Sequence, residues 1–183
     1  MLNNNPVILS DLEKKKLEEL SLNKNCLITG LFLDDVILTI SKTAHKIFYI
    51  SDSSVNHQWG NILLQMTTVE RFFEKNIGID NVVTLYGNKK ISLDLIPFNS
   101  LDLLIFGSLS NNTESENNEN LNICSEKIRQ GGKLCFFLNK PYHLNDLDLI
   151  FQNKIFSVES FERLKICTNI FFTIGKIMKF FNH

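Results

Sequence analysis

The residues of this sequence best placed to do chemistry surround a single glycine near the N-terminus. Gly30 follows the short apolar run 26–29, and the acidic pair Asp34 and Asp35 comes shortly after it. Because acidic side chains favour a helix N-terminus, this order predicts a buried strand, a sharp turn and the start of a helix. In nucleotide-type α/β domains a cofactor sits at this turn. The stretch therefore predicts the architecture of a cofactor-binding domain.

Side chains that commonly serve as nucleophiles, general bases or metal ligands are scattered through the chain. No two cysteines form a Cys-x-x-Cys pair, and no His/Cys cluster has the spacing of a zinc site. We therefore predict no catalytic residue and no metal ligand, with the cysteines acting as small buried apolar residues and the histidines solvated. The residues concerned are Cys26, Cys124, Cys135, Cys167, His45, His57, His143 and His183.

Length and composition favour one globular domain spanning 1–183. A chain of this size can bury roughly 70% of its surface, so it needs no disulfide or metal to stabilise its core. The net charge of -1 gives no electrostatic reason to expect a nucleic-acid partner. No signal-peptide pattern opens the sequence, and no apolar run is long enough to span a membrane. These features favour a cytoplasmic protein.

Short apolar runs alternate with amphipathic segments along the chain. Strands are expected at 26–29, 47–50, 81–86, 101–106 and 133–138, with a final hairpin formed by 155–165 and 168–176. Helices are expected at 9–20 (capped by Ser10), 34–44, 55–76, 121–130 and 144–151, while 89–100 is a link and the polar segment 111–120 a flexible insertion. This alternation predicts an α/β fold whose parallel sheet is covered on both faces and ends in an antiparallel hairpin.

The order of elements resembles the class I S-adenosylmethionine-dependent methyltransferases over nearly the whole chain. The best local matches are the run 101–106, similar to the fourth strand of that family, and the Gly131-Gly132 approach to the fifth. This resemblance implies a three-layer, Rossmann-like fold. Its mostly parallel sheet of seven strands would have the order 3-2-1-4-5-7-6.

The first loop of that family reads acidic-x-Gly-x-Gly-x-Gly, and this chain departs from it. When the two are aligned on Gly30, the acidic position falls on Ile28, and the later glycines become Phe32 and Asp34. Phe32 would fill space that the cofactor needs, and Asp34 would place a carboxylate near the methionine carboxylate of the cofactor. These departures argue against normal cofactor binding.

Other cofactor positions implied by the resemblance are partly retained. Asp52 follows the second strand and could bind the ribose hydroxyls, although it could equally cap the next helix. Asn88 follows the third strand and could face the adenine amine. The Asn/Asp-Pro-Pro-aromatic signature of amino-methylating members is replaced by a segment that starts at Gly107. The candidate cofactor-binding residues are therefore Gly30, Asp52, Asn88 and Gly107.

A narrower resemblance links 131–141 to the N-terminal domain of anamorsin, an iron-sulfur assembly factor whose methyltransferase-like domain lacks a working cofactor loop. We therefore expect a catalytically inactive methyltransferase-like domain that binds another protein, possesses no cofactor and has no membrane partner, with no strong signal for nucleic acid. The main alternative is an active methyltransferase that binds S-adenosylmethionine through an atypical loop, and a further one is another doubly wound fold with a different ligand.

Overall fold

The structure is a computed structural model that describes residues 9–30, 34–51, 69–76, 78–86, 89–106, 124, 126–138, 157–165 and 171–178. The predicted insertion 111–120 and the predicted helix 144–151 lie outside these residues, as does most of the predicted helix 55–76. The described helices are α1 (Asp11–Ser21), α2 (Asp34–Ile40) and α4 (Lys89–Asp94). The strands are β1 (Asn25–Gly30), β2 (Lys46–Ser51), β3 (Val82–Leu85), β4 (Leu101–Phe106), β5 (Ile128–Leu138), β6 (Ser157–Lys165) and β7 (Phe171–Met178).

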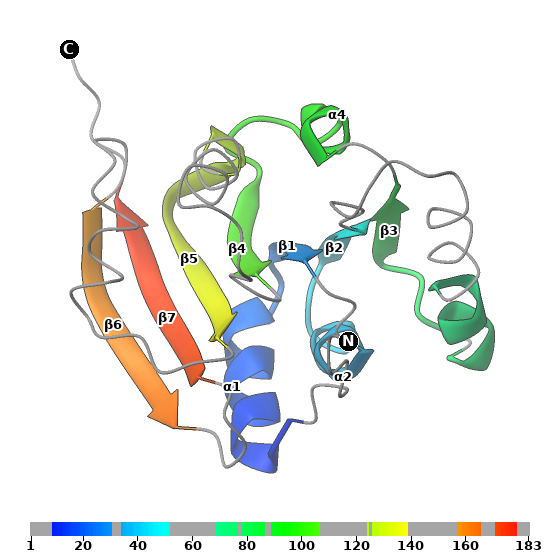
Figure 1. The fold of residues 1–183 in the computed structure, drawn as a ribbon, viewed down its shortest axis with the longest axis horizontal. Helices are drawn as coiled ribbons and strands as arrows, with labels where there is room; N and C mark the ends of the chain where they lie inside the picture. The colour runs from blue at the N-terminus through cyan, green and yellow to red at the C-terminus, as the bar shows by residue number, and fades with distance from the viewer. Residues whose placement is uncertain are drawn as a thin grey trace, which may run out of the picture.

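The strands form one sheet in the order β3-β2-β1-β4-β5-β7-β6, shown in Figure 1. The neighbours from β3 to β5 are parallel, whereas β7 pairs antiparallel with both β5 and β6. The predicted α/β class, strand order and C-terminal hairpin are therefore confirmed.

Helices cover both faces of the parallel strands. Along β1, Cys26 and Ile28 belong to one core cluster, to which α1, α2 and the helical residues 69–75 also contribute. Leu27 is fully buried outside that cluster, because successive side chains of a strand point to opposite faces. Figure 1 shows α4 on the side of the sheet opposite to α1 and α2, and its Leu93 is fully buried.

The first helix begins where its capping residues predict. Ser10 Oγ accepts a hydrogen bond from the backbone N–H of Glu13 at 3.4 Å. In return, Glu13 Oε2 accepts one from the Ser10 N–H at 2.6 Å. This reciprocal pair is a capping box, which satisfies N–H groups that a helix start leaves without partners. The predicted cap at Ser10 is therefore confirmed.

Two local predictions are wrong. The segment 89–100, predicted as a link, contains helix α4. Residues 128–130 were expected to end a helix, but they open β5, where Ile128 pairs with Leu101. The register then shifts, so that Leu103 pairs with Lys133, and β5 has more residues than β4 between these two pairs. Gly131 lies in this longer stretch of β5 and has a positive φ of 78°. Pairing with β4 thus overrides the helical spacing of the apolar residues.

A buried carboxylate joins the amino ends of three strands. Asp102 of β4 is only 8% exposed, and its Oδ2 accepts a hydrogen bond from the Asn25 N–H of β1 at 2.8 Å. Its Oδ1 forms an ion pair with Arg129 Nε of β5. Asn25 Nδ2 also donates to the Ser100 carbonyl at 3.0 Å. These contacts align β1, β4 and β5 at one edge of the sheet.

Replacing this carboxylate should cost far more stability than replacing an exposed one. Asp102→Ala leaves the Asn25 N–H without its acceptor and removes the ion pair with the largely exposed Arg129, so we expect a loss of about 1–3 kcal/mol in the free energy of unfolding, measured by urea titration. Asp94 is exposed on α4, so Asp94→Ala should change the same quantity by less than about 0.5 kcal/mol. Equal effects of the two substitutions would contradict the structural role of Asp102.

Candidate functional site

The parallel register aligns the carboxyl ends of β1, β2 and β4. Gly30 pairs with Ser51, and Thr29 pairs with Phe106. Gly30 therefore ends its strand at the edge of the sheet where ligands of open α/β domains bind. Of the candidate cofactor-binding residues, Gly30 is the one that the structure describes. Asp52, Asn88 and Gly107 lie outside the described residues.

Asp35, at the start of α2, joins this edge to the first helix. Its Oδ2 accepts a hydrogen bond from the Leu9 N–H at 2.9 Å and lies 3.5 Å from Lys14 Nζ. Its backbone carbonyl also accepts a hydrogen bond from Thr39 Oγ1 at 2.6 Å. The acidic pair therefore does more than stabilise the helix N-terminus, because one of its carboxylates holds α1 against α2.

Asp34 keeps its carboxylate at the surface beside this junction. Partial burial raises the pKa of the Asp34 carboxyl, a hydrogen bond from its own backbone amide opposes that shift, and the charge of Asp35 adds to it. The start of α2 thus carries two carboxylates close enough to interact. A helix N-terminus otherwise attracts anions, so this pair weakens that attraction here.

Thr29, directly before Gly30, was not singled out from the sequence. It is fully buried, and its Oγ1 has no hydrogen-bond partner in the described part of the chain. Burying a hydroxyl without a partner costs free energy. The signal in the sequence was a polar residue ending the apolar run 26–29. Because Thr29 has no exposed surface, its side chain packs inside the domain and cannot contact a ligand.

The cysteines that the structure describes are free and buried, as expected. Burial raises the pKa of the Cys26 thiol to about 12, with the Asp102 charge adding to the shift. Burial likewise raises the pKa of the Cys135 thiol. Thiols held in this protonated form are poor nucleophiles and poor metal ligands. Cys167 lies outside the described residues, which include no group of three possible metal-ligating side chains.

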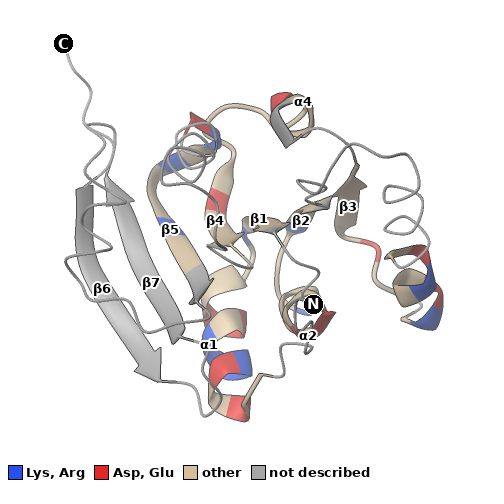
Figure 2. Cartoon of the chain, viewed as in Figure 1, with Lys and Arg blue, Asp and Glu red and all other residues tan. Residues whose placement is uncertain are grey.

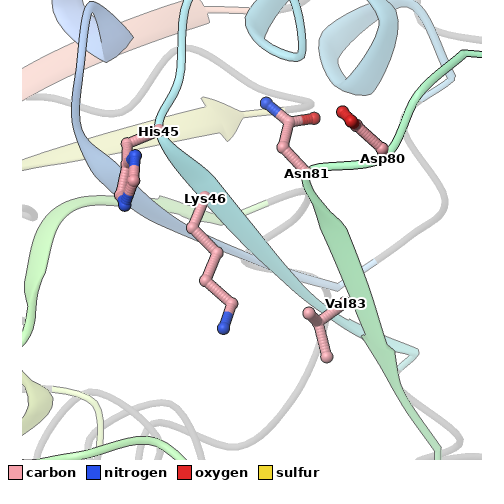
Figure 3. A pocket seen from close by; sticks show the side chains of 5 residues that line it. All are labelled: His45, Lys46, Asp80, Asn81 and Val83. Carbon is pink, nitrogen blue, oxygen red and sulfur yellow. The ribbon is translucent and has the colours of Figure 1, made fainter.

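A shallow hollow of about 360 Å³ lies at the opposite edge of the sheet, at the amino ends of β2 and β3 (Figure 3). His45, Lys46, Asp80, Asn81 and Val83 line it. The amide Nδ2 of Asn81 donates to the carbonyls of Ser41 and Ala44 at 3.0 and 2.8 Å. Asn81 thus fastens the end of α2 to the start of β3. His45 and Lys46 are exposed, in keeping with the solvated role predicted for His45.

Surface charge and helix length add two observations about partners. Figure 2 shows acidic and basic residues mixed along α1. No described helix has the length and apolarity that crossing a bilayer demands.

Comparison by sequence finds no relative: no protein-family profile matches the chain, and no curated protein matches it. Solved structures with the same fold are numerous. A tRNA methyltransferase from Aquifex aeolicus is similar with a TM-score of 0.66 and 14% identity, over 97% of this chain and 72% of that one. A SAM-dependent methyltransferase, also from Aquifex aeolicus, has a TM-score of 0.64 and 16% identity, over 92% and 89% of the two chains.

A putative methyltransferase from Streptococcus mutans, solved in complex with SAH, has a TM-score of 0.55 and 14% identity. The similarity covers 94% of this chain and all of that one. At such low identities these comparisons establish the fold alone. The chain has the class I methyltransferase fold.

The raised pKa of Asp34 predicts how stability depends on pH. A carboxyl whose pKa is raised on folding binds its proton more tightly in the folded state, so its contribution is present below the ordinary value and is lost as pH rises through the folded value. Asp34→Asn should therefore raise the melting temperature slightly at pH 7, and the difference should vanish near pH 3. Thermal melts across that range test this, and a larger difference at pH 3 than at pH 7 would contradict it.

Proposed function

We propose that this chain is a catalytically inactive methyltransferase-fold domain that acts as a protein-interaction module or partner subunit in the cytoplasm. The observation that carries the proposal is the acidic start of α2, directly after the turn at which members of this fold bind their cofactor. Asp35 is engaged there by Leu9 and Lys14. The residue directly after Asp34, the last departure from the glycine pattern, therefore takes part in the packing of α1 on α2.

We infer that Asp34 opposes S-adenosylmethionine in the position that the resemblance implies. Its methionine carboxylate would meet the exposed carboxylate of Asp34, whose pKa the charge of Asp35 already helps to raise. Two like charges in a confined site repel each other, and the Lys14 ammonium that could offset them lies against Asp35. Phe32, in the position of another family glycine, lies outside the described residues. We therefore derive no reaction step through this cofactor.

The resemblance to the anamorsin N-terminal domain suggests one setting for such a module, the assembly of cytosolic iron-sulfur proteins. The segment that carries it begins within β5, at Gly131 and Gly132. A Cβ atom added to Gly132 would lie 2.5 Å from Ile128 Cγ1, so a glycine suits this position for reasons of packing. Packing within this chain is therefore enough to explain the glycine at this position, apart from any relationship to anamorsin.

A second function, an active methyltransferase with an atypical loop, is favoured by the structural neighbours. Several are described as methyltransferases, and one was solved with SAH. In this case Gly30, Asp52, Asn88 and Gly107 would hold S-adenosylmethionine, which would supply the methyl group. Methyl transfer depends mainly on positioning the two reactants, so it does not require an acid–base pair.

Calorimetric titration distinguishes these functions. We expect the purified protein to show no heat of binding with millimolar S-adenosylmethionine or S-adenosylhomocysteine, whereas an established methyltransferase titrated in parallel should bind both. Micromolar binding would overturn the proposal. In that event Asp52→Ala should weaken the affinity, and an unchanged affinity would remove Asp52 from the site.

A matched pair of substitutions tests the physical reason. Asp34→Asn removes the charge at the cofactor turn, whereas Asp80→Asn removes an exposed charge at the opposite edge of the sheet. If repulsion excludes the cofactor, Asp34→Asn should give a measurable heat of binding with millimolar S-adenosylmethionine at low salt, where the unsubstituted chain gives none. Asp80→Asn should have no effect. An equal gain from both would show that the position of the charge is irrelevant.

A further inference from the structure

Strand β3 closes one end of the sheet and, among the described strands, pairs with β2 alone. The Ile47 N–H of β2 donates to the Asn81 carbonyl at 2.8 Å, so the backbone of Asn81 faces β2. Because successive residues of a strand direct their N–H and C=O groups to opposite sides, the backbone groups of Val82 and Thr84 face away from β2. They take part in no hydrogen bond among the described residues. The outer edge of β3 is therefore a row of free donors and acceptors.

The composition of β3 does not protect this edge from pairing. Its residues Val82–Leu85 are uncharged and include no proline, and its pairing with β2 has no shift of register. Natural edge strands commonly carry Lys, Pro or a β-bulge that prevents pairing with another chain. Val83 is also 37% exposed, although it is apolar. A strand this short offers few hydrogen bonds, so a second contact has to select what pairs with it.

The helical segment 69–75 lies at the same end of the sheet as β3 (Figure 1). Its Val69 and Phe72 belong to the core cluster. Burial, and after it the charge of Glu70, raises the pKa of Tyr86, which directly follows β3, so Glu70 lies near that end of the strand. The exposed charged residues of the segment are Glu70, Arg71, Glu74 and Lys75. Figure 2 shows acidic and basic residues together on it.

The order of these charges is self-complementary. From 70 to 75 the residues are acidic, basic, apolar, apolar, acidic and basic, and the reversed order has the opposite sign at every charged position. An antiparallel copy of the segment therefore places Glu70 opposite Lys75, and Arg71 opposite Glu74. Within one segment, residues four apart carry like charges, which disfavours an isolated helix. Among the described residues, none of these four side chains forms an ion pair.

We propose that two copies of this chain associate about a two-fold axis, with the outer edges of their β3 strands paired antiparallel and their segments 69–75 side by side. The backbone groups of Val82 and Thr84 would bond those of the second copy, and Val83 would lose exposed apolar surface. A two-fold axis sets one patch against the same patch, so the patch must complement itself. The strand edge and the charge order both meet this condition. An unrelated protein would need to supply the same charge order, whereas a second copy always does.

The contact is small, because it involves one short strand and one short helical segment from each copy. Interfaces that bury less than about 1,200 Å² belong to the weak, transient class, so the dimer should form only at high protein concentration. The cofactor turn after β1 is no part of this contact. The association therefore goes beyond the proposed function, and the calorimetric titration neither supports nor contradicts it.

Sedimentation equilibrium of the full chain at low salt, at concentrations up to about 1 mM, tests the proposal. We expect the apparent mass to rise with concentration from that of one chain toward that of two. Glu74→Lys sets like charges opposite each other, and symmetry repeats the change, so it should weaken the association about five- to tenfold. Adding Arg71→Glu to Glu74→Lys makes the facing charges opposite again and should restore the association. A chain that stays monomeric throughout would overturn the proposal.

Glu19→Lys is the matched control, because Glu19 is exposed on α1 and undergoes the same change of charge. It should leave the association unchanged, and an equal loss from Glu19→Lys and Glu74→Lys would contradict the proposed contact, as would failure of the double variant to recover. Thr84→Pro removes an N–H that faces away from β2, so it should block dimerisation and leave the thermal melt of the monomer close to that of the original chain. Undiminished association of a folded Thr84→Pro variant would rule out the strand pairing. The charge variants test the dimer independently of this substitution.

Discussion

The carboxylate of Asp102 is the constraint on which the arrangement of this domain depends. From the centre of the sheet it binds the backbone of β1 on one side and Arg129 of β5 on the other. Because parallel strands share one direction, fixing their amino ends also fixes the level at which their carboxyl ends meet. The alignment of Gly30 with Ser51, and of Thr29 with Phe106, follows from this register. The buried carboxylate of Asp102 therefore affects how the strands align at the carboxyl edge of the sheet, which it does not contact.

The first turn of α2 shows how packing and cofactor chemistry compete for the same residues. In the methyltransferase resemblance this turn belongs to the cofactor, and its glycines let the backbone approach closely. Here Asp35 instead holds α1 through Leu9 and Lys14, and Asp34 adds a second negative charge. A turn that stabilises the contact between two helices in this way has less freedom to accept an anionic ligand. This competition is the physical basis for proposing a module that binds protein instead of cofactor.

The two edges and the two faces of the sheet therefore differ in charge and in exposed apolar surface. The carboxyl edge is acidic at α2, and the amino edge holds the open hollow beside Asn81. On the face that α4 covers, some apolar residues outside the core are exposed to solvent, and the buried Lys127 contacts the ring of the exposed Phe98.

The sequence by itself determined the fold class and the cap of the first helix, whereas the strand order was implied by the resemblance to the class I methyltransferases. Alternating apolar runs and the Ser10–Glu13 pattern are local signals, and local signals survive without knowledge of distant contacts. It also identified Gly30 as the end of β1, and Cys26, Cys124 and Cys135 as buried residues. The tertiary structure decided that 128–130 join β5, because pairing with Leu101 and the ion pair with Asp102 outweigh the helical spacing there. It also decided that Lys127 meets Phe98 and that Asp35 meets Leu9. Each of these contacts joins residues far apart in the chain, so no pattern within one segment could predict it.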